Sequence, residues 1–263
     1  MPASIPTHRF DALTAQVFPD RVAMGRAAAE DVARHLRACL RVQDEARVVF
    51  AAAPSQDDFL AALVEHDLAW DRVVAFQMDE YLGLPNGHEA TFAAYLQRHV
   101  IRLVPLKTLH ALRLTAGDPE AECTRYAALL NAAPLDVVCL GIGENGHLAF
   151  NDPPVADFED PASVKVVTLD LACRQQQVHD GCFPSLADVP TQALTLTIPA
   201  LLRGARLSVV VPGAQKAQAV HDTLVQPIST ACPASILRRQ ASAYLYVDEA
   251  AFHLVAPMNR PAA

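Results

Sequence analysis

The feature that most constrains the fold of this chain is an alternation of short apolar runs with amphipathic segments. Residues 47–53 are β-branched, aromatic and small, and they end at Pro54, which is typical of a buried strand. We expect further strands at 72–77, 135–140, 165–169, 206–211 and 243–247, and helices at 22–40, 55–65, 89–99, 119–131 and 214–224. Strand and helix in repeated alternation predict a mostly parallel sheet with helices on both faces.

The whole chain reads as one domain. No internal repeat, low-complexity tract or linker divides the 263 residues, and hydrophobic residues make up 52% of them. We therefore expect a single α/β domain over residues 1–263, a Rossmann-like three-layer αβα sandwich. Residues 1–20 are expected to form an N-terminal extension and residues 256–263 a tail.

Charge and targeting signals narrow the function classes. With 21 basic and 29 acidic residues the net charge is −8, which disfavours nucleic acid and anionic membranes as partners. No apolar run approaches the roughly 20 residues of a spanning helix, and residues 1–9 do not resemble a secretory signal. The six cysteines form no C-x-x-C pair and are expected to be reduced thiols. A cytoplasmic enzyme is the expectation.

Two acidic residues follow the strand predicted at 72–77. Ligands of open α/β sheets bind outside the carboxyl ends of the strands, so residues at these ends are candidates for chemistry. Asp79 and Glu80 are adjacent and point to opposite sides, so one of them at most enters the crevice. Asp79 is a candidate general base, because partial burial raises the pKa of a carboxylate. The alternative is that Asp79 caps a turn or a helix.

A glycine-rich loop follows the strand predicted at 135–140. Segment 141–154 contains G-x-G-x-x-G, but it runs into two prolines instead of opening a helix, so it is a weak match to a dinucleotide fingerprint. Its backbone amides can approach a small ligand. His147 lies between Asn145 and Asp152, and an oriented imidazole of this kind suits proton transfer near neutral pH. The alternative is a structural histidine.

Lys216 is one of only three lysines and stands at the start of a predicted helix. A cation is unfavourable at a helix N-terminus, unless it shares an anionic ligand with the helix amides. Lys216 is therefore a candidate phosphate ligand. A solvated surface lysine is the alternative.

Together these segments resemble the glucosamine-6-phosphate deaminase/isomerase family over about residues 22–254. The residues that carry the resemblance are 76–81, 141–153, 193–197 and 213–216. The related 6-phosphogluconolactonases share the fold but usually lack the Phe-Asn-acid-Pro ending found here at 150–153. They are the second choice.

The resemblance implies a reaction and roles for the candidate residues. It implies conversion of glucosamine 6-phosphate to fructose 6-phosphate with release of ammonia, without a metal or a redox cofactor. Asp79 would be the base that moves a proton from C2 to C1, and His147 would assist ring opening. Asp152 and Asn145 would hold the histidine, and Lys216 would bind the phosphate.

The sequence departs from the family pattern at the phosphate end. The family's glycine-rich phosphate loop is replaced by segment 51–56, which has no glycine, so an altered anchor is expected. Asn145 stands where an aspartate is typical, and Asp152 where a glutamate is usual. The further candidates for binding substrate and phosphate are Ser55, Gly143, His179, which falls at the position of a family arginine, and Arg174 nearby.

Two other functions remain open. One is an aldose-ketose isomerase or a lactonase that acts on another phosphosugar. The other is a sugar-phosphate sensor without turnover, but residues 1–46 contain no basic recognition segment of a DNA-binding module. The expected partner is a small phosphosugar, and a homo-oligomer is compatible with the sequence.

Overall fold

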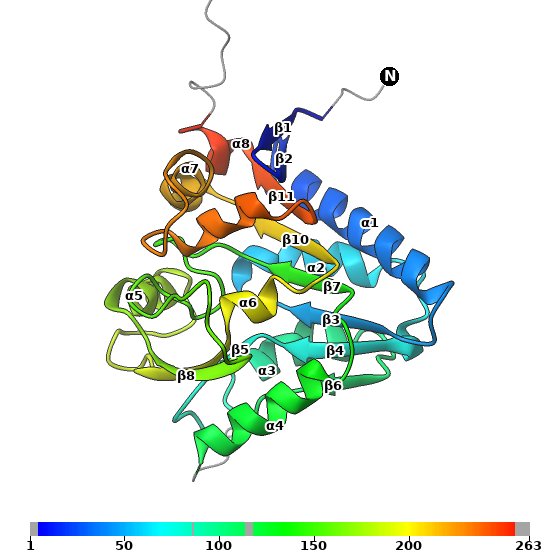
Figure 1. The fold of residues 1–263 in the computed structure, drawn as a ribbon, viewed down its shortest axis with the longest axis vertical. Helices are drawn as coiled ribbons and strands as arrows, with labels where there is room; N and C mark the ends of the chain where they lie inside the picture. Colours follow the sequence, from blue (N-terminus) through cyan, green and yellow to red (C-terminus); the bar gives the residue numbers. More distant parts are fainter. Residues whose placement is uncertain (1–4, 86, 114–117, 256–263) are drawn as a thin grey trace, which may run out of the picture.

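The computed structural model describes residues 5–85, 87–113 and 118–255. Its main sheet has eight strands in the order β1-β2-β11-β10-β7-β3-β4-β6, which follow one another from top to bottom in Figure 1. Every pairing in this sheet is parallel except that of β1 with β2. The strands are β1 (Thr7–Phe10), β2 (Leu13–Phe18), β3 (Ala46–Phe50), β4 (Val73–Gln77), β6 (Thr108–His110), β7 (Val137–Leu140), β10 (Arg206–Val211) and β11 (Ala243–Asp248).

Three further strands form a separate antiparallel sheet. They are β5 (Asp79–Tyr81), β8 (Val164–Thr168) and β9 (Gln192–Leu196), in the order β5-β9-β8. The strand predicted at 165–169 therefore exists, but it lies outside the main sheet. β5 and β9 were not predicted as strands. They have only three and five residues, and segments this short show too little periodicity in the sequence.

The N-terminal segment is not an appendage over its described residues. β2 pairs in parallel with β11 and so continues the main sheet, and β1 pairs with β2 at its edge. Leu13, Ala15, Val17 and Phe18 are buried. The prediction of an extension at residues 1–20 is therefore wrong for residues 13–18, because the apolar residues that alternate along β2 are buried in the core. The predicted tail at 256–263 lies outside the described residues.

Helices cover both faces of the main sheet. They are α1 (Arg21–Leu40), α2 (Asp57–Val64), α3 (Phe92–Leu96), α4 (Pro119–Asn131), α5 (Leu171–His179), α6 (Ile198–Leu201), α7 (Ala217–Val225) and α8 (Glu249–Phe252). The helix predicted at 89–99 is shorter, since α3 begins after Thr91, whose hydroxyl accepts from the amide of Ala94, and passes into a π-type turn at Gln97–Ile101. No helix in the described ranges is long and apolar enough to cross a membrane.

The central strands are buried on both faces, so successive residues enter two separate apolar clusters. Along β3, Val49 packs with residues of α4, α6 and α7, whereas Val48 and Phe50 pack with α1, α2 and α3. Two cores separated by one sheet define three layers. The predicted single-domain αβα sandwich class is thereby confirmed in its architecture.

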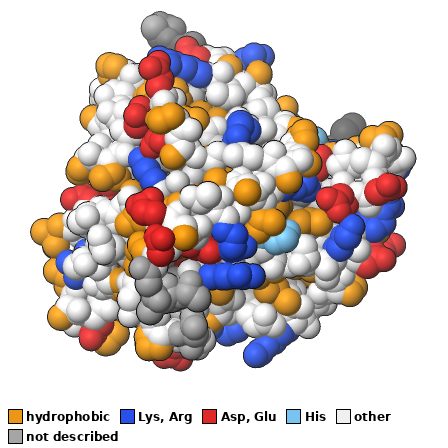
Figure 2. All heavy atoms as spheres, turned by 60° about the horizontal axis from the view of Figure 1, so that its bottom comes forward, with side chains coloured by type: hydrophobic (Ala, Val, Ile, Leu, Met, Phe, Trp, Pro, Cys, Tyr) orange, Lys and Arg blue, Asp and Glu red, His pale blue; other side chains and the backbone are white. Residues whose placement is uncertain are grey.

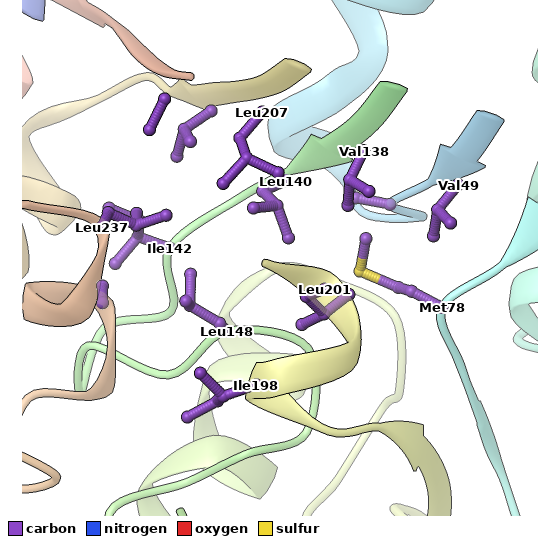
Figure 3. Packing of buried hydrophobic residues seen from close by; sticks show 14 of the residues in the cluster. Val49, Met78, Val138, Leu140, Ile142, Leu148, Ile198, Leu201, Leu207 and Leu237 are labelled. Carbon is purple, nitrogen blue, oxygen red and sulfur yellow. The ribbon is translucent and has the colours of Figure 1, made fainter. Parts of the chain in front are cut away.

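The first of these clusters also holds two loops at the strand ends in place. Figure 3 shows Met78 and Leu148 beside Leu140 and Val138 of β7, together with Leu201 of α6. Met78 is 3% exposed and Leu148 is fully buried. Because each is adjacent in sequence to a polar residue, Asp79 and His147, the core determines where these two side chains start.

Candidate active site

One cavity lies at the carboxyl ends of the parallel strands, where the sequence predicted that the polar residues would converge. It is lined by the segments after β3, β4 and β7, by α5 and by the turn before α7. Of the predicted site residues, the cavity brings together Ser55, Asp79, Gly143, His147 and Lys216. Apolar walls come from Met78, Phe92, Ile142 and Phe150.

Asp79 is the buried carboxylate of the cavity. It is 7% exposed and begins β5, directly after the end of β4. Burial, followed by the neighbouring Glu80 carboxylate, raises the pKa of Asp79 well above its ordinary value. A carboxylate in this condition is a stronger base when ionised than an aspartate in water.

Glu80 points away from the cavity, as the alternation of a strand requires. Its carboxylate accepts hydrogen bonds from the backbone amides of Phe92 and Ala93 at 3.0 and 2.9 Å and from Nε2 of Gln77 at 2.6 Å. It therefore binds the start of α3. Burial raises the pKa of Glu80, and these hydrogen bonds oppose the rise. The prediction that only one of the two acids enters the crevice is confirmed.

The glycine loop wraps tightly around the imidazole of His147. The amide of Gly143 donates to the carbonyl of His147 at 3.0 Å, and that of Gly146 donates to the carbonyl of Gly143 at 3.0 Å. A Cβ atom at Gly143 would overlap the His147 ring. Gly146 has a φ of 80°, a conformation that residues with side chains rarely adopt. Glycine is thus required for the turn and for the close approach of the ring.

His147 and Asp152 form a buried pair behind the cavity. Nδ1 of His147 lies 2.9 Å from Oδ1 of Asp152, although its N–H is not aligned for a hydrogen bond. Asn145 donates from Nδ2 to the same oxygen at 3.0 Å, and the amide of Asp170 donates to the other oxygen at 3.1 Å. Burial alone would raise the pKa of Asp152, but the nearby His147 and these two donors hold it below its ordinary value.

Strand β9 connects this pair with Asp79. Thr195 lies opposite Asp79 in the β5–β9 pairing, and its hydroxyl accepts a hydrogen bond from the amide of Phe150 at 3.1 Å. Asn151 donates from Nδ2 to the carbonyls of Leu148 and Leu196, both at 2.8 Å. The base and the histidine loop are therefore held by one strand. The sequence offered only the resemblance at 193–197 as a signal for it.

Ser55 and Lys216 also line the cavity. Ser55 lies in a single turn, Pro54–Gln56, that precedes α2, and its hydroxyl accepts from Nε2 of Gln56 at 3.1 Å. Lys216 ends the turn Ala214–Lys216 before α7 and is 7% exposed. Burial lowers the pKa of Lys216, while the carboxylates of Asp180 and Glu144 oppose the shift. A buried ammonium of this kind gains from an anionic ligand.

His179 and Arg174 do not line the cavity. The side chain of His179 is 64% exposed and lies 3.6 Å from the carboxylate of Glu144. Arg174 donates to the carbonyls of Leu186 and Val189 at 2.7 and 2.9 Å and so supports the loop after α5. The structure does not bring these two predicted ligands to the site.

Two glutamines of α5 lie where those residues were expected. Gln176 and Gln177 both line the cavity and are 5% and 7% exposed. A helix at 171–179 was not among the predicted elements, because this segment has only weak apolar periodicity. Without a predicted helix, neither glutamine could be assigned to a helix face, and nothing distinguished the two from polar residues of a loop.

One cluster among the described residues could hold a metal ion. Possible ligand atoms of His147, Asp152 and Cys173 all lie within 4.8 Å of one another, and all three residues are buried. Imidazole, carboxylate and thiolate are ligands that suit zinc. The first two already form the pair behind the cavity.

A family model described as glucosamine-6-phosphate isomerases/6-phosphogluconolactonase matches residues 19–246. The chain belongs to this family. Glucosamine-6-phosphate deaminases of Bacillus thuringiensis (strain Al Hakam) and Bacillus anthracis (strain A0248) are each 30% identical to it over 215 residues, which cover 82% of this chain and 80% of theirs.

Solved structures of the glucosamine-6-phosphate isomerase/6-phosphogluconolactonase family show the same fold. A monomeric glucosamine-6-phosphate deaminase superposes with a TM-score of 0.83 at 26% identity, over 91% of this chain and 99% of its own. A 6-phosphogluconolactonase from Thermotoga maritima superposes with a TM-score of 0.73 at 17% identity, over 90% of this chain and 99% of its own. The family resemblance inferred from the sequence is confirmed, and the family contains both activities.

Proposed function

We propose that this protein deaminates an aminosugar phosphate, converting glucosamine 6-phosphate to fructose 6-phosphate and ammonia. The observation that carries the proposal is the pairing, in one cavity, of a buried carboxylate with raised pKa, Asp79, and an imidazole backed by an ionised acid, His147 with Asp152. The curated deaminases at 30% identity support the choice of substrate class.

Ring opening is the first step that the site supports. The ring oxygen of the sugar must gain a proton while the hydroxyl at C1 loses one, which leaves an aldehyde at C1 of the open chain. His147 can carry out this transfer, since imidazole exchanges protons near neutral pH. Asp152 lies beside Nδ1, so a proton on that nitrogen faces a carboxylate whose lowered pKa keeps it ionised. This arrangement leaves Nε2 for the substrate.

Proton transfer between carbons is the second step. Asp79 removes the proton from C2, the electrons form a C1–C2 double bond, and the π bond of the C1 carbonyl breaks toward its oxygen. That oxygen gains one proton while the amino group loses one. Asp79 then returns its proton to C1 as the nitrogen lone pair forms a C2–N double bond. The product is an imine at C2, which water hydrolyses to the ketone, so that one water is consumed and one ammonia is released. A base with a raised pKa suits both halves of this transfer, because it must take up the proton and then give it back.

The phosphate end of the substrate is assigned to Lys216 and Ser55. Both line the cavity, and Lys216 is buried. An ammonium and a hydroxyl held in a largely apolar cavity bind an anion more strongly than in water. Holding the far end of the chain places C1 and C2 against the two proton-transfer groups.

Ammonia release from glucosamine 6-phosphate tests the proposal. We expect the wild-type protein to release ammonia, the Asp79→Asn variant to lose the activity by a factor of about 10⁴, and the His147→Gln variant by a factor of about 10²–10⁴. An activity that survives in the Asp79→Asn variant would contradict the assignment of the base. Circular dichroism of both variants checks that they fold.

A second candidate is isomerisation of another aldose phosphate. The observation that favours it is that Asp79 is the only acidic residue among the described lining residues, so the cavity offers no second carboxylate to bind the ammonium of an aminosugar. The base and the imidazole would serve an aldose without an amino group in the same way. Formation of ketose from glucose 6-phosphate or another aldose phosphate, without ammonia release from glucosamine 6-phosphate, would select this function.

A further inference from the structure

Gln177 is a buried polar residue of the cavity that has no role in the proposed ring opening, proton transfer or phosphate binding. It lies on α5, is 7% exposed and lines the cavity together with Asp79 and Phe92. Its side-chain Oε1 accepts a hydrogen bond of 2.6 Å from the hydroxyl of Tyr81. Tyr81 follows Asp79 by two residues on β5, so both side chains leave the same face of the strand.

Tyr81 is held too tightly to change its orientation. It is fully buried, and its ring lies against the rings of Phe92, Phe150 and Phe183 with centroid distances of 4.8, 5.3 and 5.3 Å. Burial raises the pKa of Tyr81, so its hydroxyl keeps its proton. A protonated phenol in a fixed position donates to the glutamine oxygen and thereby determines which end of the amide faces it.

The other end of the Gln177 amide is available. Within the described ranges Nε2 of Gln177 has no hydrogen-bond partner, and it is not among the polar atoms that are sealed from solvent without one. Gln177 itself is one of the residues that line the cavity. A side-chain donor of a cavity residue that makes no hydrogen bond within the protein can bind an oxygen of a ligand in that cavity.

The neighbouring glutamine shows the contrast. Oε1 of Gln176 accepts from the amide of Glu144 at 2.8 Å, and its Nε2 donates to Asp180 at 3.2 Å. Both ends of that amide are used to join α5 to the glycine loop and to the residue after the helix. Gln176 therefore has a structural role, whereas Gln177 keeps its donors for a ligand.

We propose that Gln177 binds the sugar through its side-chain amide, which donates to a hydroxyl or carbonyl oxygen next to Asp79, and that Tyr81 is its positioning residue. The proposal rests on the proposed function, because it names a further contact with the same substrate. It also orients the ligand. An amide N–H group repels the ammonium of an aminosugar, so an oxygen faces Gln177 and the amino group faces away from it.

Variants of Gln177 test the contact. Gln177→Leu removes the donor, and Gln177→Glu keeps an oxygen for Tyr81 but replaces the donor by an acceptor. We expect KM for glucosamine 6-phosphate to rise about tenfold in Gln177→Leu and more in Gln177→Glu, with a smaller change in kcat. Gln192→Glu is the control, because it introduces the same charge at an exposed residue of β9 that does not line the cavity.

Binding can be measured separately from turnover with 2-amino-2-deoxyglucitol 6-phosphate, an open-chain analogue that has no carbonyl carbon to react. Calorimetric titration gives its Kd for each variant. Gln177→Asn, which keeps the amide on a shorter side chain, serves as a further variant should Gln177→Leu not fold. We expect Kd to rise in the order wild type, Gln177→Leu, Gln177→Glu.

The role of Tyr81 is tested by a double-mutant comparison. Tyr81→Phe removes the hydroxyl that fixes the Gln177 amide, so that the amide can rotate by about 180°. We expect this substitution to raise Kd for the analogue severalfold in the wild-type background and not at all in the Gln177→Leu background. Tyr246→Phe is the control, since Tyr246 is also buried and donates to Asp31 at 2.8 Å, but outside the cavity. It should leave Kd unchanged. Equal effects of Tyr81→Phe in both backgrounds would contradict the positioning role.

The outcomes separate this inference from the proposed function. A wild-type protein that releases no ammonia but binds the analogue through Gln177 overturns the proposed function alone. A wild-type protein that releases ammonia, with KM and Kd unchanged in a folded Gln177→Leu variant, overturns the inference alone. Failure of the wild type to bind the analogue and to release ammonia overturns both.

Discussion

At the scale of single residues, the site depends on what surrounds each carboxylate. Asp79 and Asp152 are both buried aspartates, but their pKa values move in opposite directions. Asp152 receives hydrogen bonds from Asn145 and the amide of Asp170 and lies beside His147. Asp79 has the Glu80 carboxylate as its neighbour, and no donor reaches it in the described part of the chain. One environment keeps an acid ionised, and the other prepares a base.

The pH dependence of stability follows from the raised pKa of Asp79. Between the ordinary aspartate pKa of about 3.9 and the raised value, the folded protein binds a proton that the unfolded chain releases, so the wild type loses stability as pH rises. Asn cannot lose this proton. We therefore expect the Tm of Asp79→Asn to exceed that of the wild type by a margin that grows through this window and is constant above it.

Thermal unfolding of both proteins from about pH 4 to about pH 9 measures this margin. A Tm difference that does not change with pH would contradict the raised pKa. The activity moves the opposite way, since kcat/KM of the wild type is expected to rise as Asp79 ionises with increasing pH. Function and stability thus make opposing demands on one carboxylate.

Gly143 offers a test of how closely the imidazole is held. Its φ is not in the left-handed region, so alanine is compatible with the backbone, but the added Cβ would overlap the His147 ring and displace it. We expect Gly143→Ala to lower kcat/KM about 100-fold while the free energy of unfolding falls by about 1–3 kcal/mol. Steady-state kinetics and urea denaturation measure the two effects. Retention of wild-type kcat/KM would mean that the ring position is not critical.

At the scale of elements, the site is assembled by short segments that pair across the molecule. β5 carries Asp79, β9 holds the histidine loop through Thr195, and the two strands pair with each other. Glu80 binds the start of α3 and so fixes the other side of β5. The turn before α7 brings Lys216 to the cavity. The small sheet therefore holds Asp79 and the loop of His147 in one place.

Replacement of Lys216 tests the anchor at the start of α7. Lys216→Ala removes the buried ammonium from the cavity, and we expect KM for glucosamine 6-phosphate to rise tenfold or more, at about 1.4 kcal/mol for each factor of ten. The effect should be much smaller for glucosamine without phosphate. Lys107→Ala is the matched control, because Lys107 is exposed and pairs with Glu45. An equal change for both sugars would contradict a phosphate contact.

At the scale of the whole molecule, one sheet separates two apolar cores, and the candidate site lies at the carboxyl ends of its strands. The fold departs from the sequence prediction near the N-terminus, where β2 pairs with β11 and extends the main sheet. On the face drawn in Figure 2, acidic and basic side chains are interspersed with apolar ones. The phosphosugar partner, a homo-oligomeric state and a cytoplasmic location stay predictions.

The contribution of β2 to the fold can be measured. Leu13 is fully buried and belongs to the same cluster as Leu140 and Met78. We expect Leu13→Ala to lower the free energy of unfolding by about 2–5 kcal/mol. Val42→Ala, at a residue that is 84% exposed, should change it by less than about 0.5 kcal/mol. Chemical denaturation that finds Leu13→Ala as stable as Val42→Ala would show that β2 is a dispensable extension.

Regular periodicity explains which elements were predicted. The strands at 72–77, 135–140, 206–211 and 243–247 and the helix at 119–131 are present in the structure within a few residues of their expected limits. Long apolar runs and clear amphipathic faces must be buried, so they leave a signal in the sequence. β5, β6 and α6 have only three or four residues each. Elements so short are stabilised by their tertiary contacts, and they leave almost no periodic signal in the sequence.

The sequence by itself determined the layered fold, the ends of the strands where chemistry would lie, and the placement of Asp79, His147 and Lys216 at those ends. These features depend on local pattern and on the geometry common to parallel sheets. Only the tertiary structure decided that Gln176 and Gln177 line the cavity, that His179 and Arg174 do not, and that Thr195 connects the segments of Asp79 and His147. Such contacts join segments far apart in the chain, and no local pattern encodes which side chains will meet across them.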